Sequence, residues 1–518
     1  MCISSSVVVG NLGLIGEDKC RGMMAKESTP TITTTTTPHF CRRRLLLGFV
    51  VLGIFYGLII VDAATTTTTT TTSVENNGKP ISRISFGSCS NQTAPQPIWD
   101  AVLRFDPDLF IWLGDNIYAD SKKPRKFTGK GRNSGLWKNT PRFFQVTAAE
   151  MEHQYQLMKN VSGYVKLREQ TEVIGTWDDH DFGLNDAGKE LEGKQTSQKL
   201  MLDFLDEPLD SPRRRQEGVY TSYTYGPAGK QIKVILLDTR YHRDPIGSDG
   251  TMLGDAQWQW FENELRNSSA QIHIIGSSIQ VVANFSAMSQ PFFSVESWNL
   301  FPKERMKLYD LLQETNVSGV MFISGDVHFC EIARYDCGLS YPLYDFTSSG
   351  ITQGVEELAP PPLSYIFAFA AWITPNTLRV YNPRCRYHSC VYGKQNFGGL
   401  EINWDADPVA INVDIRDVHG VPVLGTSFTL NELQPGYQRV QPPQHGQVQR
   451  HCTLEIELPW HQRYLLAILF FGTLTANTLL AFSILCKVFH KVCGGLIYLV
   501  IGAISLIKRR STQKPKPD

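Results

Sequence analysis

The chain has 518 residues, of which 42% are hydrophobic and 19% are charged. This length is enough for one large domain or two ordinary domains with a buried core. Lys and Arg together number 50, and so do Asp and Glu, so the net charge does not direct the protein toward nucleic acid or an acidic surface. We therefore expect no nucleic-acid binding.

The first 78 residues indicate export rather than a folded domain. Residues 1–44 are polar and contain the run TITTTTTP, which cannot bury enough apolar surface to become ordered, so they are predicted to be a disordered tail. Residues 45–61 are uncharged and follow three arginines, which is typical of a signal peptide, and they are also just long enough to remain as a signal anchor. Residues 62–78 are rich in threonine and are predicted to be a flexible linker.

Short apolar runs alternate with helical patterns through residues 79–458, which we predict to be the main folded domain. Each run has the length of a buried strand. The runs cover residues 81–89, 108–115, 172–179, 232–240, 272–280 and 320–328. This alternation is typical of an α/β fold in which helices cover the sheets.

Five of the six runs end in residues that could bind a metal ion or contact phosphate. These residues are Cys89, Asp115, Asp178 with Asp179, Asp238 with Arg240, and Asp326 with His328. In α/β sheets, ligands bind outside the carboxyl ends of the strands, so we expect these side chains to converge although they are far apart in sequence.

The sequence TWDDHDFG, residues 176–183, places three carboxylates around one imidazole, His180. Clustered carboxylates without a nearby Lys or Arg are unfavourable unless a cation neutralises them, and a multivalent metal ion is the usual solution. Taken one at a time, Asp residues at strand ends could equally be helix caps or turn residues.

The types of residue narrow the choice of metal. Tyr118 lies three residues after Asp115, so a phenolate and a carboxylate could reach the same ion. Phenolate, thiolate and carboxylate together suit a hard ion such as Fe(III), while oxygen ligands suit Ca(II) or Mg(II). The alternatives are that Tyr118 is a core aromatic residue and that Cys89 is a small buried apolar residue.

Six short motifs point to a known family. In chain order they are FGSCSNQ, WLGDNIYAD, TWDDHDFG, LLDTRYHRD, GSSIQ and SGDVHF, followed by NFGGLEINWD. In order and spacing, residues 80–405 resemble the PhoD-like alkaline phosphatases (alkaline phosphatase D), which belong to the calcineurin-like metallophosphoesterases. The resemblance implies a four-layer αββα sandwich of two mixed sheets. It also implies an Fe(III) and Ca(II) centre, in which Mg, Mn or Zn could substitute, that hydrolyses phosphate esters.

The resemblance also implies roles for individual residues. The implied metal ligands are Cys89, Asp115, Tyr118, Asp178, Asp179, Asp326 and His328. Asp178 is either a ligand or a carboxylate that supports one. His180 would contact phosphate or protonate the leaving alcohol, and Arg240 would clamp phosphate or form a structural pair with Asp238. A metal-bound hydroxide would attack phosphorus, so no protein nucleophile is required.

The C-terminal region indicates membrane attachment. Residues 464–485 are uncharged and precede Lys487 and Lys491, which predicts a transmembrane helix with its C-terminal flank in the cytosol. The apolar segment 494–507 is short for a span, so an interfacial or re-entrant segment competes with a hairpin. Residues 508–518 are predicted to be a basic cytosolic tail, and their KPKPD ending resembles a dilysine-type retrieval signal.

Sugar acceptors and cysteines fit a lumenal or extracellular domain. Asn-X-Ser/Thr acceptors occur at Asn91, Asn160, Asn267, Asn284 and Asn316. Two close cysteine pairs, Cys330 with Cys337 and Cys385 with Cys390, could form local disulfides, whereas Cys452 lacks a neighbour in sequence. We therefore place the protein in a membrane of the secretory pathway, either endomembrane or cell surface.

Two further segments could contribute to the site. The apolar stretch 364–375 is expected to pack in the core, although an exposed version beside the site could admit lipid-like substrates. The stretch 381–392 carries Arg384, Arg386 and His388 and is either a lid or a solvated surface loop.

Three functional interpretations remain open. The first is a membrane-anchored phosphomonoesterase or phosphodiesterase with broad substrates. The second is a secretory-pathway phosphodiesterase that acts on glycolipid or GPI-anchor head groups. The third is a catalytically silent glycoprotein in which the metal sites only stabilise the fold. The sequence leaves oligomeric state undetermined.

Overall fold

The computed structural model describes residues 74–76, 78–120, 143–283, 295–358, 365, 369, 371–373, 376–437, 451–454 and 457–511. The predictions for the tail 1–44, the export segment 45–61, nearly all of the linker 62–78, the acceptor Asn284 and residues 512–518 lie outside this range.

One mixed sheet has seven strands in the order β1–β5–β6–β7–β8–β10–β9. Its centre is parallel, from β6 through β7 and β8 to β10, and antiparallel pairs join β5 to β6 and β10 to β9. The strands are β1 (Val74–Asn76), β5 (Thr221–Tyr225), β6 (Ile232–Leu236), β7 (Ile272–Gly276), β8 (Val320–Ser324), β9 (Cys330–Tyr335) and β10 (Leu343–Ser348).

The second mixed sheet has six strands in the order β13–β12–β11–β2–β3–β4. The neighbours β2, β3 and β4 are parallel, while β11, β12 and β13 form an antiparallel meander that joins β2. The strands are β2 (Arg83–Gly87), β3 (Leu109–Leu113), β4 (Glu172–Thr176), β11 (Asn396–Asn403), β12 (Ala410–Asp417) and β13 (Pro422–Thr429).

Strand β3 shows why its sequence, LFIWL, is apolar at every position. Alternate side chains of a strand point to opposite faces of the sheet. Ile111 belongs to the core between the two sheets, whereas Trp112 faces outward and packs in edge-to-face geometry against Trp99 of the covering helix, with ring centroids 5.5 Å apart. Because both faces of the sheet are covered, the strand carries no polar alternation.

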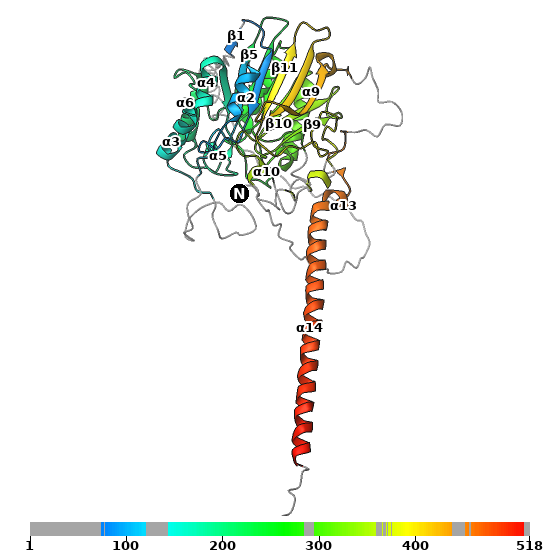
Figure 1. Cartoon of the computed structure of the whole chain (residues 1–518). Helices are drawn as coiled ribbons and strands as arrows, with labels where there is room; N and C mark the ends of the chain where they lie inside the picture. Colours follow the sequence, from blue (N-terminus) through cyan, green and yellow to red (C-terminus); the bar gives the residue numbers. More distant parts are fainter. Residues whose placement is uncertain are drawn as a thin grey trace, which may run out of the picture. The chain divides into compact units, whose positions relative to one another are not determined.

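Helices cover the outer faces of both sheets (Figure 1). Those against the β2–β3–β4 side are α2 (Ile98–Phe105), α3 (Ala148–Lys159), α4 (Ser162–Gln170) and α6 (Lys194–Phe204). Those against the seven-stranded sheet are α7 (Gly254–Arg266) and α9 (Pro302–Thr315). The short helices are α5 (Asp179–Phe182), α10 (Val355–Leu358) and α13 (Trp460–Arg463), with 3₁₀ turns η1 (Pro212–Arg214), η2 (Trp298–Leu300) and η3 (Leu430–Leu433). The predicted αββα sandwich of two mixed sheets is confirmed.

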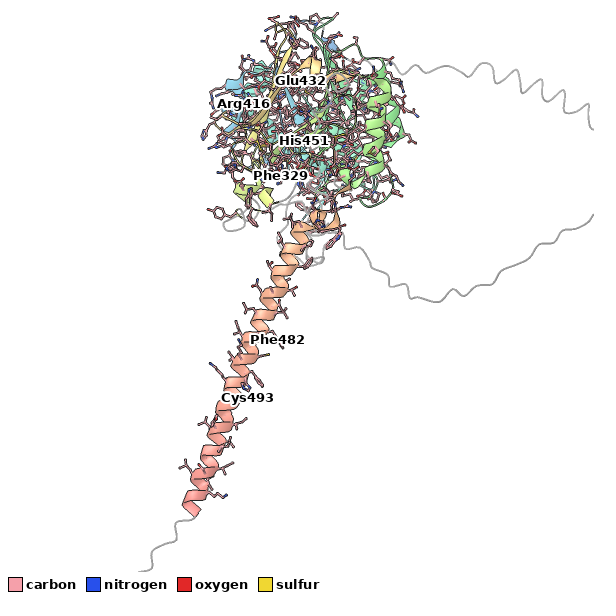
Figure 2. The ribbon with its side chains drawn as sticks, turned by 90° about the vertical axis from the view of Figure 1, so that its right-hand side faces the viewer. Phe329, Arg416, Glu432, His451, Phe482 and Cys493 are labelled. Atoms are coloured by element: carbon pink, nitrogen blue, oxygen red, sulfur yellow. A yellow bond between two sulfur atoms is a disulfide. The ribbon has the colours of Figure 1, made fainter. Side chains whose placement is uncertain are left out.

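The C-terminal helix differs from the expectation of two separate apolar segments. Helix α14 (Leu465–Ser511) continues through both segments for 47 residues, and Phe482 and Cys493 mark its course in Figure 2. At 1.5 Å per residue it is about 70 Å long, more than twice the roughly 30 Å hydrocarbon core of a bilayer. Residues Leu465–Lys508 of this helix are apolar and long enough to cross a membrane.

One of the two disulfides considered from sequence is wrong. The described residues form the bridges Cys385–Cys390 and Cys337–Cys452. Cys330 is instead a buried free thiol at the start of β9, whereas Cys337 lies beyond the other end of that strand. An extended strand of six residues separates its ends by roughly 16 Å, too far for a disulfide.

Candidate metal centre

Four of the seven predicted ligands lie shortly after strands and share an uncommon backbone conformation. The φ angles are positive at Cys89 (63°), Asp115 (51°), Asp326 (70°) and His328 (59°). A non-glycine residue in this left-handed region costs roughly 1–3 kcal/mol and persists only where surrounding structure enforces it. This strain at four residues beyond the ends of three strands is typical of a functional site.

These strand ends bring the predicted ligands into overlapping groups. In each group the potential ligand atoms lie within 4.8 Å of one another, and every residue is buried. The groups are Cys89 with Asp115 and His328; Asp115 with Asp179 and His180; Asp178 with Asp179 and Asp326; and Asp179 with Asp186 and Glu296. Asp115 and Asp179 each belong to more than one group, so either could bridge neighbouring ions.

Tyr118 and His180 line the side of the centre that is nearest to Asp115. The hydroxyl of half-buried Tyr118 lies 2.8 Å from Nε2 of His328, and its ring lies 4.3 Å from the His180 ring, centroid to centroid. The Nδ1 atom of His180 lies 2.6 Å from Oδ1 of Asp120, and its Nε2 atom lies 4.0 Å from Oδ1 of Asp179. The Nε2 side of the imidazole is thus the side nearer the carboxylate cluster.

The third carboxylate of TWDDHDFG, Asp181, holds the two loops together. Its side chain accepts hydrogen bonds from the backbone N–H groups of Asp178 (2.6 Å), Asn116 (3.1 Å) and Asp115 (3.3 Å). The close approach of these loops also requires Gly114, where a Cβ atom would lie 2.5 Å from Cβ of Asp178 and φ is +95°. Asp181 therefore positions the candidate ligands rather than joining them.

The buried carboxylates disfavour negative charge when they have only each other as neighbours. Burial, together with the neighbouring Asp179, Asp178 and Asp181, raises the pKa of Asp115 well above its usual range, although His180 opposes this rise. Burial likewise raises the pKa of Asp178 to about 7 and that of Asp326 well above normal. A bound cation would reverse these shifts because it stabilises the ionised carboxylates.

Unsatisfied polar atoms test whether a metal fits here. Oδ2 of Asp178, Oδ1 of Asp179 and Oδ2 of Asp326 are buried and have no hydrogen-bond partner among the described residues. Burying an acceptor without a partner is unfavourable, and these three residues form one of the close groups. The oxygen-rich side of the centre therefore suits a hard divalent cation, and the side with Cys89, His328 and Tyr118 suits a transition metal.

Arg240 is buried against carboxylates of the centre and is not open to solvent. Its side chain is fully buried, its Nε atom donates to Oδ1 of Asp178 at 2.6 Å, and its other end pairs with Glu296. Glu296 also pairs with Arg243 at 3.1 Å. The predicted structural pair between the Arg240 side chain and Asp238 is not formed. From Arg240, Asp238 accepts the backbone N–H alone, at 2.8 Å.

Sequence reasoning missed Asp120, Asp186 and Glu296. Asp120 stands in the motif WLGDNIYAD, so its position five residues after Asp115 was a usable signal. Asp186 also has positive φ (53°), and its backbone N–H donates to Oδ2 of Asp179 at 2.6 Å. Glu296 follows none of the apolar strand runs, so the sequence pattern contained no signal for it.

The two accessory segments also differ from expectation. The prediction that 364–375 packs in the core is wrong at its described aromatic positions, because Tyr365, Phe369 and Trp372 are exposed. Arg384 lies on the outer face of the meander, where its Nη1 donates to Oδ1 of Asn412 (2.9 Å) and Oγ of Ser427 (2.8 Å).

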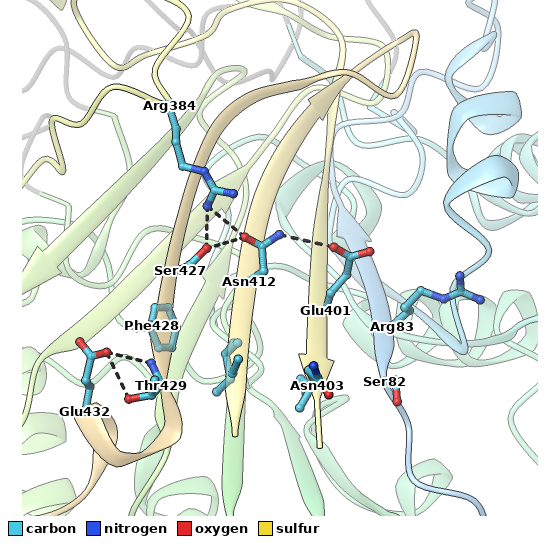
Figure 3. A pocket seen from close by; sticks show the side chains of 13 residues that line it. Ser82, Arg83, Arg384, Glu401, Asn403, Asn412, Ser427, Phe428, Thr429 and Glu432 are labelled. Atoms are coloured by element: carbon cyan, nitrogen blue, oxygen red, sulfur yellow. Dashed lines mark hydrogen bonds between the residues drawn. The ribbon is translucent and has the colours of Figure 1, made fainter. Parts of the chain in front are cut away.

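This face forms a hollow of about 600 Å³ (Figure 3). None of the residues that line the hollow belongs to the metal centre. Arg384 in the stretch 381–392 is therefore a surface residue against β12 and β13, whereas Tyr392 at the end of the stretch pairs through its backbone with Cys330 of β9.

Comparison with known proteins identifies the family of the chain. Residues 84–367 match the family described as PhoD-like phosphatase. The chain is 25% identical over 276 residues to alkaline phosphatase D of Bacillus subtilis (strain 168), which covers 48% of this chain and 46% of that protein. The chain thus spans about half the length of this curated relative.

One solved structure shows the same fold. A structure described as PhoD matches with a TM-score of 0.50 and 19% identity, covering 69% of this chain and 70% of the other. A weaker likeness, with a TM-score of 0.41 and 11% identity, is to GAP50, the anchor in the inner membrane complex of Plasmodium, covering 69% of this chain and 91% of the other.

Proposed function

The chain belongs to the PhoD-like phosphatase family, and on this premise we propose that it is a membrane-anchored, metal-dependent hydrolase of phosphoric esters. The observation that carries the proposal is the sharing of Asp115 and Asp179 among neighbouring ligand groups. Shared carboxylates at this spacing are what a pair of adjacent metal ions requires.

We assign the ligands to two sides of the centre. Cys89, Tyr118 and His328 would hold Fe(III) together with Asp115, and Asp178, Asp179 and Asp326 would hold Ca(II), with Mg, Mn or Zn as possible substitutes. When bound, such ions supply an activated water molecule and neutralise the phosphoryl oxygens. Asp186 and Glu296, which approach Asp179, would complete the oxygen-rich side.

His180 is the group that would exchange a proton with the substrate. Its Nδ1 atom is held by Asp120, so the side of the ring nearer the cluster is free to present a proton to the leaving oxygen. Arg240 would act as a positioning residue, because it neutralises Asp178 and Glu296 from behind. Phosphate contact by Arg240 would require its guanidinium to leave these two partners.

The anchor and the compartment are part of the proposal. Helix α14 has the length and composition to insert into a bilayer, so a phosphatase carrying it would act at a membrane surface. The acceptors Asn160, Asn267 and Asn316 are exposed, as glycosylation in the secretory pathway requires. These features support a catalytic domain on the lumenal or extracellular side.

Metal content and turnover of the full chain in detergent test the proposal. We expect iron and calcium to copurify, and we expect hydrolysis of phosphate monoesters or diesters to stop when Asp179→Ala removes a shared ligand. Tyr118→Phe is expected to abolish a visible phenolate-to-iron absorption band while iron remains bound. A protein that binds metal but hydrolyses no ester on a broad panel would favour the silent glycoprotein, and an active, colourless, iron-free enzyme would exclude the iron assignment.

A further inference from the structure

Three large aromatic side chains are exposed between α10 and β11. Tyr365 is 71% exposed, Phe369 is 55% exposed and Trp372 is 63% exposed, and the Phe369 and Trp372 ring centroids lie 5.9 Å apart. The backbone is helical at each of these three positions. Grouped exposed apolar side chains of this size mark an interaction surface. We call these three residues the aromatic face.

The aromatic face is tied to the strand that begins beside the metal centre. The buried Arg379 guanidinium donates to the carbonyl of Ala371 at 3.2 Å and to Oε2 of Glu331 at 2.8 Å. Glu331 lies three residues after His328, whose carbonyl accepts the N–H of Val355 at 2.8 Å. Hydrogen bonds from Val355 and Arg379 thus hold the chain before and after the aromatic face close to His328 and Glu331.

The same segment is also tied to the start of the membrane helix. Thr377, five residues after Trp372, donates from Oγ1 to the carbonyl of Thr453 at 2.7 Å, and its own carbonyl accepts the N–H of His451 at 3.2 Å. Trp460, which is 69% exposed and opens α13, is seven residues beyond Thr453. A fully extended chain would span at most about 18 Å from Trp372 to Thr377 and about 25 Å from Thr453 to Trp460.

We propose that the aromatic face, together with Trp460, docks on the lipid bilayer that α14 enters and holds the metal centre at the membrane surface. The inference rests on the proposed function and deepens it, because it names the substrate class as phosphate esters carried by lipids. Trp and Tyr combine an apolar ring with a polar group and therefore favour the headgroup region of a bilayer. The short connection between the aromatic face and α14 indicates that the face contacts lipid, since it keeps the face close to the point where α14 enters the membrane.

Fluorescence quenching of the full chain in vesicles tests the docking directly. The probe is phosphatidylcholine with brominated acyl chains, which quenches only tryptophans that reach the bilayer. We expect Trp372→Phe to remove a share of the quenched fluorescence comparable to that lost in Trp460→Phe. Trp260→Phe, which changes a partly buried residue of α7, is the matched control and should leave the quenched share unchanged. A Trp372→Phe protein quenched as fully as wild type would overturn the proposal.

Activity supplies a second and independent measurement. In the variant with Tyr365→Ser, Phe369→Ser and Trp372→Ser, we expect hydrolysis of phosphatidic acid in vesicles to fall about tenfold, because interfacial binding scales with buried apolar area. Hydrolysis of soluble p-nitrophenyl phosphate should not change, and Leu209→Ser, at an 88% exposed position, should alter neither rate.

The outcomes separate the docking surface from the enzyme assignment. An equal loss on both substrates, or no loss on either, would overturn the docking proposal. A triple variant that changes oligomeric state without any change in quenching would assign the face to a protein partner and would also overturn it. If wild type hydrolyses neither ester, the proposed function fails, while the quenching result still decides whether the face contacts lipid.

Discussion

The imidazole of His180 is paired with the carboxylate of Asp120, with 2.6 Å between Nδ1 and Oδ1. The side chains of both residues are buried, and Asp120 also accepts the backbone N–H of Asn185 at 2.9 Å. Burial opposes a charged imidazole, but the carboxylates of Asp120, Asp179 and Asp115 together raise the pKa of His180 well above its ordinary value. The pair therefore has the geometry of a proton donor held in one orientation.

Asp120→Asn should slow hydrolysis most for esters with poor leaving groups. The amide preserves the shape of Asp120 but removes the charge that stabilises protonated His180, so protonation of the leaving oxygen becomes harder. We expect kcat to fall about 100-fold for an alkyl phosphate and less than about tenfold for p-nitrophenyl phosphate, whose leaving group needs no proton. Equal losses on the two substrates would show that Asp120 only supports the fold.

Much of the centre could be predicted because its residues sit where strands end. The rule that ligands gather beyond the carboxyl ends of strands applies to Asp115, Asp179 and Asp326, and each of these follows a mainly apolar run. The same runs predicted the layered fold, because strands that are apolar on both faces need helices on both sides. The local sequence pattern was sufficient to predict a residue's position wherever its burial follows from the strand to which it belongs.

Residues fixed by long-range contacts were beyond the reach of that pattern. Glu296 meets Arg240 from a segment without its own strand, and Cys452 reaches Cys337 across 115 positions of sequence. The stretch around Phe369 was expected to be buried because it is apolar, but composition alone does not distinguish a core from a docking face. The role of Arg240 was open for the same reason, since either partner of its guanidinium comes from another part of the chain.

Metal binding to the stripped protein should release protons. Burial raises the pKa of Asp178 to about 7 and that of Asp115 and Asp326 well above normal, so part of this set is protonated near neutral pH when no cation is present. A cation stabilises the ionised forms and displaces those protons. We expect removal of metal by a chelator to abolish activity and lower the Tm, and re-addition of calcium or iron in weak buffer to acidify the solution.

The proton release has a defined pH dependence. It should shrink as the pH rises above the pKa of the metal-free carboxylates, because fewer protons remain to be displaced. Calorimetry in two buffers of different ionisation enthalpy measures the number released. Metal binding at neutral pH without any proton release would contradict the arrangement of buried, uncompensated carboxylates.

Arg240→Met should destabilise the fold, and removing a partner charge should restore part of the loss. The substitution leaves Asp178 buried without its guanidinium and leaves Glu296 with only Arg243, and removing one partner of a buried pair costs about 3–5 kcal/mol. The double variant Arg240→Met with Glu296→Gln removes the excess carboxylate charge and is expected to be the more stable of the two.

The matched control is Arg384→Met on the surface of the meander. Its side chain is 47% exposed, so its contact with Asp414 should contribute less than about 1 kcal/mol. Chemical unfolding of the four proteins measures these differences. A double variant that is less stable than Arg240→Met alone would show that Glu296 has a more important partner than Arg240.

His273 should make the protein lose stability in mild acid through a group far from the metal centre. It lies in β7, where its Nδ1 contacts the Ser318 carbonyl at 2.7 Å and its Nε2 contacts Oγ of Ser268 at 2.7 Å, an arrangement that fits a neutral ring. Burial lowers the pKa of His273 to about 4 from an ordinary value of 6.5. Because the folded pKa lies below the unfolded one, the unfolded chain binds the proton first as the pH falls.

The resulting loss begins near pH 6.5 and continues to about pH 4. Between pH 7 and pH 5 it amounts to about 2 kcal/mol for this one group. His273→Gln keeps a donor and an acceptor but cannot take up the proton, so its free energy of unfolding should fall by about 2 kcal/mol less than that of wild type over this interval. His153→Gln, which changes an exposed histidine, should track wild type. Identical pH profiles for wild type and His273→Gln would mean that His273 is not held neutral in the fold.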